Sequence, residues 1–125
     1  MKKILITIFF LWCSSSFGAD KHTTFTNEIF QKAQADGKII VINSWDRWCP
    51  ICKKQTKLLN QAKKDFEDVL FLTFEHKKNK KIAKLLNIQH FSTIVFYKNG
   101  KEVARGIGDT NKSRIYSLLK QLNET

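Results

Sequence analysis

The segment Ser44–Cys52 constrains the fold of this chain more than any other. Two of its cysteines, Cys49 and Cys52, are separated by two residues. The apolar, β-branched run Ile39–Trp45 leads into them and predicts a buried strand, and the run Cys49–Phe66 carries apolar residues at helical spacing. The sequence therefore predicts a strand followed by a Cys-x-x-Cys motif at the start of a helix. This setting is typical of thiol–disulfide exchange.

Residues 1–19 have the pattern of a secretory signal peptide. Two lysines precede the uncharged apolar run 4–12, and small and polar residues follow it. The apolar run is too short to span a bilayer as a permanent anchor. We therefore predict a signal peptide at 1–19, cleaved after Gly18 or Ala19, and one mature domain at 20–125 in the periplasm. A retained membrane anchor is the alternative.

Cleavage removes one of the three cysteines, Cys13, and leaves Cys49 and Cys52 as a pair. A lipid anchor at Cys13 is disfavoured, because Trp12 is large where such signals need a small residue. The pair is a redox centre, a permanent disulfide or two metal ligands. The redox interpretation is favoured, since a disulfide that closes so short a loop stabilises little. Two protein ligands alone are also too few for a closed zinc site.

The charge of the chain is strongly basic, with 22 lysines and arginines against 11 acidic residues and a net charge of +11. Loss of Lys2 and Lys3 with the signal peptide leaves 20 basic residues against the same 11, about +9. The basic residues are scattered except at 77–81, and no aromatic-interleaved nucleic-acid motif is present. We interpret them as a solvated, lysine-rich surface and expect no nucleic-acid partner.

The remaining periodicity predicts an α/β domain with the order α-β-α-β-α-β-β-α. Asn99-Gly100 is a strong hairpin signal between the last two strands. We expect a mixed central sheet of four or five strands with helices on both faces. The expected elements other than the first strand and its helix are helices at 25–35, 79–87 and 110–123 and strands at 69–75, 93–98 and 101–106.

With these motifs in this order, the chain resembles the thioredoxin-like family over nearly all of 20–125. The resemblance rests on Trp45-x-x-Trp48-Cys49-x-x-Cys52, on Thr93–Gly100 and on Ile107-Gly108 before the last helix. It implies a thioredoxin fold and an exported thiol–disulfide oxidoreductase. The implied redox group is the Cys49–Cys52 disulfide, with no bound cofactor or metal. The implied partners are exported proteins with thiols or disulfides and a membrane or periplasmic redox partner.

The chemistry of an exposed catalytic pair follows from its place at the start of a helix. Unpaired N–H groups and the helix dipole there stabilise a thiolate, which makes Cys49 the expected nucleophile. Cys52, one turn further along, is the expected resolving thiol. Pro50 suits the first helical turn because its missing N–H costs nothing there. Pro50-Ile51 differs from the Gly-Pro pair of thioredoxin itself and favours a less reducing potential, but the direction of the reaction stays open.

The resemblance also places residues around the pair. Trp45 and Trp48 match tryptophans that pack under the active-site loop and shape its surface, although simple core packing also explains Trp45. Gly108 lies in the matching loop before the last helix. Asp46 and Arg47 are expected in an exposed turn, with Arg47 solvated.

Two residues depart from the family pattern. Ser92 occupies the position of a cis-proline that aligns substrates, and we expect a trans Phe91–Ser92 bond because a non-proline cis bond costs about 3–4 kcal/mol. Asn43 occupies the position of a buried acid that serves the second cysteine. An amide cannot accept that proton near neutral pH, so Asn43 is interpreted as a satisfied core amide.

His90 precedes Ser92 by two residues, in the loop that faces the pair in relatives. A histidine there can tune a thiolate, relay a proton or bind a metal, and an exposed loop histidine is the simpler interpretation. The alternative function is therefore a metal or iron–sulfur binding or delivery module that uses Cys49, Cys52 and His90.

Overall fold

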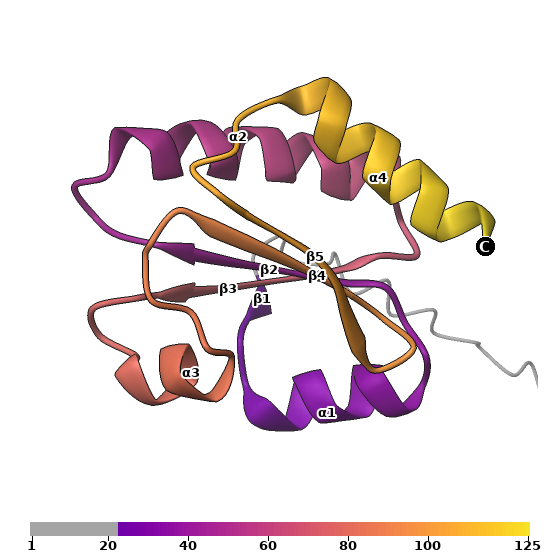
Figure 1. The fold of residues 1–125 in the computed structure, drawn as a ribbon, viewed down its shortest axis with the longest axis horizontal. Helices are drawn as coiled ribbons and strands as arrows, with labels where there is room; N and C mark the ends of the chain where they lie inside the picture. Colours follow the sequence, from indigo (N-terminus) through magenta and orange to yellow (C-terminus); the bar gives the residue numbers. More distant parts are fainter. Residues whose placement is uncertain (1–22) are drawn as a thin grey trace, which may run out of the picture.

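The computed structural model describes residues 23–125 (Figure 1). The predicted signal peptide and its cleavage site lie outside the described residues. Within 23–125, no helix has the length and apolar character needed to cross a membrane. The elements are β1 (Thr23–Thr24), α1 (Asn27–Ala35), β2 (Ile40–Trp45), α2 (Pro50–Asp65), β3 (Leu70–Glu75), α3 (Lys80–Leu85), β4 (Thr93–Lys98), β5 (Lys101–Ile107) and α4 (Lys112–Glu124).

The described strands form one mixed sheet of five strands in the order β1-β3-β2-β4-β5. β1, β3 and β2 are parallel, whereas β4 runs antiparallel to β2, and β5 antiparallel to β4. The fifth strand is β1, whose two residues are too few to show a period in the sequence. It pairs with Leu72 and Thr73 of β3, and Phe25 N–H extends this pairing by donating to the Thr73 carbonyl. The mixed α/β sheet is therefore confirmed in its five-stranded form.

Two helices cover each face of the sheet (Figure 1). α2 and α4 lie on one face, and α1 and α3 lie on the other. Because side chains alternate along a strand, Ile40 and Ile42 of β2 join the core under α1, while Val41 joins the core under α2. The same alternation places Asn43 on the α2 face, directly below the helix that carries the cysteines.

Local capping explains where the helices begin. The Thr26 side chain accepts the N–H of Ile29 and starts α1, and the Asn111 side chain accepts the N–H of Arg114 and starts α4. α4 therefore begins at Lys112, two residues later than periodicity indicates. The predicted hairpin is confirmed: Asn99 and Gly100 adopt φ values of 52° and 77°, the left-handed pair that a two-residue hairpin loop requires.

Candidate active site

The two cysteines lie at the start of α2, just after the loop that follows β2. Cys49 is the N-cap of α2, with extended backbone, and Pro50 begins the helix. The Cys49 Sγ accepts a hydrogen bond of 3.0 Å from the Cys52 N–H. Cys49 and Cys52 form a disulfide with their Cα atoms 5.2 Å apart. The sulfur of Cys49 therefore already receives one of the free N–H groups of the helix start, which are the groups that stabilise a thiolate after reduction.

The pair is less exposed than the sequence indicates. Cys49 is 5% exposed and Cys52 is 2% exposed, so the expectation of an exposed pair is wrong for the disulfide form. The reason is the N-cap geometry, which turns the Cys49 sulfur back over the first turn of α2 rather than toward solvent. A partner must therefore approach closely to reach the disulfide.

The two tryptophans of the motif lie in different surroundings. Trp45, the last residue of β2, is partly buried and lines a cavity together with Cys52. Trp48 is 80% exposed, so it does not pack under the active-site loop as the resemblance implies. Ile51 and Phe91 are also exposed apolar side chains. Two of these exposed apolar residues, Trp48 and Ile51, each directly precede a cysteine of the pair in the chain.

The expectation that Asp46 lies in an exposed turn is wrong. Asp46 is 7% exposed, whereas Arg47 is exposed as expected. The Asp46 carbonyl accepts the N–H of Cys49 at 3.3 Å, which draws the turn inward. Its carboxylate lies 3.3 Å from the Nζ of Lys77, and this ion pair compensates the buried charge.

Ser92 holds the loop before β4 through its backbone. The described residues contain no cis peptide bond, so the predicted trans Phe91–Ser92 bond is confirmed. Ser92 has a φ of 60°, a left-handed conformation that costs about 1–2 kcal/mol in a non-glycine residue. Its N–H donates to the Ser44 carbonyl at 2.8 Å, and its carbonyl accepts the N–H of Gly108 at 2.8 Å. These bonds, made at both backbone atoms, offset the cost.

Asn43 is a buried amide whose hydrogen-bond partner comes from α2. Its Nδ2 donates to the Oε1 of Gln55 at 3.3 Å. Gln55 lies one turn beyond Cys52, is 0% exposed, and donates through Nε2 to the carbonyls of Ser92 at 2.9 Å and Asp109 at 3.0 Å. One side chain therefore ties the cysteine helix to β2 and to both loops at this edge of the sheet.

Gln55 was missed by the sequence analysis. Its position in the helix indicates its role. The buried residues of α2 are Cys52, Gln55, Leu59 and Ala62, and Gln55 is the one amide among them. A polar residue on an inward helical stripe needs internal hydrogen-bond partners. The sequence alone does not name those partners, because both carbonyls come from loops distant along the chain.

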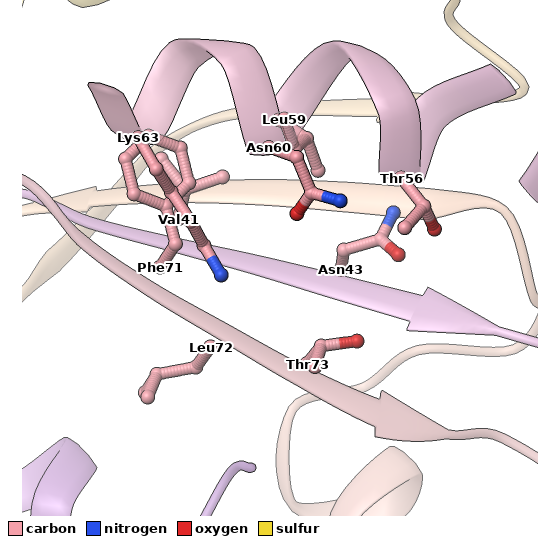
Figure 2. A pocket seen from close by; sticks show the side chains of 9 residues that line it. All are labelled: Val41, Asn43, Thr56, Leu59, Asn60, Lys63, Phe71, Leu72 and Thr73. Carbon is pink, nitrogen blue, oxygen red and sulfur yellow. The ribbon is translucent and has the colours of Figure 1, made fainter. Parts of the chain in front are cut away.

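A small cavity with a mostly apolar lining lies below α2 next to Asn43 (Figure 2). Its volume is about 20 Å³, enough for about one water molecule. Burial lowers the pKa of the Lys63 ammonium at one side of it. No acidic side chain lines this cavity. The lining residues are Val41, Asn43, Thr56, Leu59, Asn60, Lys63, Phe71, Leu72 and Thr73.

Asn43→Asp is expected to make stability fall with rising pH. Burial raises the folded-state pKa of a carboxyl above its unfolded value of about 3.9, so stability is lost as the pH rises from there toward the folded pKa. The loss approaches about 1.4 kcal/mol for each unit of pKa shift. Urea unfolding at pH 4 and pH 8 measures it, with the exposed Asn123→Asp as control. Equal pH dependence in both variants contradicts the prediction.

His90 is exposed and contributes only its backbone carbonyl, which accepts from Ser44 Oγ at 3.0 Å and Thr93 Oγ1 at 2.6 Å. Across 23–125, no three His, Cys, Asp or Glu side chains are grouped to hold a metal ion. The alternative with Cys49, Cys52 and His90 as ligands therefore lacks a ligand set in the described part of the chain.

Gly108 and Asp109 form the loop between β5 and α4. Gly108 has a φ of 68°, which explains a glycine at this turn, and its N–H reaches Ser92. The pKa of the Asp109 carboxyl is lowered, chiefly by the hydrogen bond from Arg114, whose Nη2 lies 2.7 Å from Asp109 Oδ1. The structure thus brings Asn43, Ser92 and Gly108, which the resemblance places around the pair, together around Gln55.

Comparison with known proteins agrees with this geometry. The thioredoxin family model matches residues 20–121. Thioredoxin H-type from Fagopyrum esculentum is 34% identical over 92 residues, which cover 74% of this chain and 79% of that protein. Thioredoxin from Mycoplasma genitalium is 32% identical over 82 residues, covering 66% and 80% respectively.

Solved structures agree as well. The crystal structure of Trxlp from Edwardsiella tarda superposes with a TM-score of 0.74 and 27% identity, covering 78% of this chain and 97% of that one. Fasciola hepatica thioredoxin superposes with a TM-score of 0.70 and 21% identity, covering 82% and 98%, which supports the fold. The chain therefore belongs to the thioredoxin family and is a thioredoxin-like thiol–disulfide oxidoreductase.

Proposed function

We propose that this protein exchanges thiols and disulfides of exported proteins in the periplasm, with Cys49 as nucleophile and Cys52 as resolving thiol. The observation that carries the assignment of roles is the hydrogen bond from the Cys52 N–H to the Cys49 Sγ at the start of α2. It stabilises negative charge on Cys49, whereas Cys52 lies within the helix.

The exchange needs two steps. In the reduced protein, the Cys49 thiolate attacks one sulfur of a substrate disulfide, that bond breaks, and the leaving thiolate takes up a proton. Cys52, once deprotonated, attacks the Cys49 sulfur of the mixed disulfide and releases the second substrate thiol. Two electrons pass from the pair to the substrate, and the pair becomes the disulfide seen in the structure. A dithiol of a membrane or periplasmic redox partner returns the electrons by the reverse exchange.

The pattern of residues 1–19 supports export to the periplasm. Expression of the full chain in a Gram-negative host, followed by fractionation and intact-mass measurement, tests this. We expect a periplasmic protein that begins at Ala19 or Asp20 and has lost Cys13. A chain that retains residues 1–19 in the membrane fraction contradicts the proposal.

The reduction potential of the pair is expected to lie above the roughly −270 mV of thioredoxin. The N-cap hydrogen bond stabilises the reduced thiolate, and Asn43 supplies no negative charge beneath it. Equilibration with glutathione buffers, read by thiol alkylation and mass, gives the potential. A value at or below that of thioredoxin contradicts the prediction, and a value well above that of glutathione identifies an oxidase.

We further propose that the disulfide is the only redox group and that no metal or other cofactor is bound. Protein purified without oxygen is expected to contain two titratable thiols in 20–125 after reduction and no stoichiometric metal by elemental analysis. A stoichiometric metal would favour the alternative of a metal-binding module.

A further inference from the structure

A groove of about 280 Å³ lies beside the disulfide. Cys52 forms part of its wall, and Trp45 supplies an apolar surface. Arg47 and Lys53 line the groove, are exposed, and have no ion-pair partner in 23–125. The groove therefore places two positive charges, without an ion-pair partner in the described chain, beside Cys52 of the redox pair.

The acidic side chains in the surrounding loops do not offset these charges, because each is paired. Asp46, which also lines the groove, lies 3.3 Å from Lys77. Glu75 at the end of β3 lies 3.3 Å from Lys78. Asp109 in the loop after β5 pairs with an arginine of α4 at 2.7 Å. The net field at the groove is therefore positive.

We propose that this groove binds an acidic segment of the partner polypeptide, next to the cysteine that reacts with Cys49. This inference rests on the proposed function and names the class of substrate for the same site. The guanidinium of Arg47 suits a carboxylate because it donates two parallel hydrogen bonds, and Lys53 adds a second charge. The carboxylates are expected close to the reacting cysteine along the partner chain, because Arg47 and Lys53 line the same groove as Cys52.

The charges of Arg47 and Lys53 at the edge of the groove are expected to affect association with the substrate more than the chemical step. Complementary rim charges raise the association rate and lose this effect in salt. Exposed pairs each contribute roughly 0.2–1 kcal/mol, so two contacts correspond to about a twofold to thirtyfold preference.

Matched disulfide peptides test the inference on the reduced protein. Three peptides share one sequence and carry two glutamates, two lysines or two serines at positions two and three from the cysteine. We expect kcat/KM at low salt to be about twofold to thirtyfold higher for the glutamate peptide than for the lysine peptide. We expect the difference to lie in KM and to shrink at 0.5 M salt.

Charge reversal supplies the decisive comparison. The double variant Arg47→Glu with Lys53→Glu is expected to invert the ratio of kcat/KM for the glutamate peptide to kcat/KM for the lysine peptide. Both values are measured on the same variant, so a general change in activity cancels in the ratio. Lys38→Glu with Lys101→Glu changes the net charge equally at the opposite end of the sheet and is expected to keep the wild-type ratio. Circular dichroism checks that each double variant is folded.

The outcomes separate the two proposals. If the glutamate and lysine peptides react at equal rates and the disulfide of the serine peptide is also reduced, the acidic-partner inference is overturned and the proposed function stands. An equal change of the ratio in both double variants also overturns it, because the preference then reflects net charge alone. Failure to reduce any of the three peptides overturns both.

Discussion

Cys49→Ser is expected to abolish the reduction of insulin disulfides, leaving only the rate of the dithiol reductant alone. A serine hydroxyl forms no mixed disulfide, so the first bond of the exchange cannot be made. Cys52→Ser is expected to retain that first step and to stop there, because no thiol remains to attack the Cys49 sulfur. Mixed disulfides with substrate, seen as a mass increase that dithiothreitol removes, should therefore accumulate in Cys52→Ser.

In full-length protein that retains residues 1–19, Cys13→Ser is the matched control, since it removes the third cysteine and leaves Cys49 and Cys52 in place. It is expected to keep full activity. Insulin reduction by Cys49→Ser at the wild-type rate would show that Cys49 is not the nucleophile. Accumulation of mixed disulfides in Cys49→Ser, with none in Cys52→Ser, would reverse the two roles.

The parts of the fold that were predicted correctly depend on local patterns. The strand into Cys49, the helix that follows and the Asn99-Gly100 hairpin are each specified by neighbouring residues. Alternation along β2 also places Asn43 under α2. Local periodicity and turn chemistry therefore predict which elements exist, what type they are and which face they present.

The features that the sequence did not predict depend on contacts between distant segments. β1 exists because Thr23 and Thr24 pair with β3, about fifty residues away. Asp46 is buried because its loop folds inward and Lys77 covers the carboxylate. The burial of Cys49 is the exception, because it accompanies a local N-cap hydrogen bond from the Cys52 N–H three residues away. None of these features has a period or a motif in the residues that show it.

The amide network explains how this domain keeps its active-site edge without the acid and the proline of the family pattern. Ser92 keeps its φ at 60° because three hydrogen-bond partners hold its backbone N–H and carbonyl. Asn43 needs a buried acceptor, and Gln55 supplies it. Because the network has no ionisable member, its hydrogen bonds do not change with pH over the range in which thiols titrate.

Gln55→Leu is accordingly expected to destabilise the protein by about 2–5 kcal/mol. The substitution leaves Asn43 Nδ2 and the Asp109 carbonyl without their hydrogen bonds and removes one of two donors to the Ser92 carbonyl. Each buried group left unpaired costs about 1–3 kcal/mol, against a total stability of roughly 5–15 kcal/mol for such domains. Urea unfolding measures the loss, and Gln61→Leu, exposed on the same helix, is the control.

A double-mutant cycle separates the amide pair from helix packing. Asn43→Val added to Gln55→Leu removes the donor that Gln55→Leu leaves unpaired. The double variant should therefore lose less stability than the sum of the losses of the two single variants. Strict additivity would mean that Asn43 and Gln55 are not coupled. A loss for Gln55→Leu no greater than that for Gln61→Leu would mean that the network does not stabilise the fold, since only Gln55 reaches the carbonyls of both flanking loops.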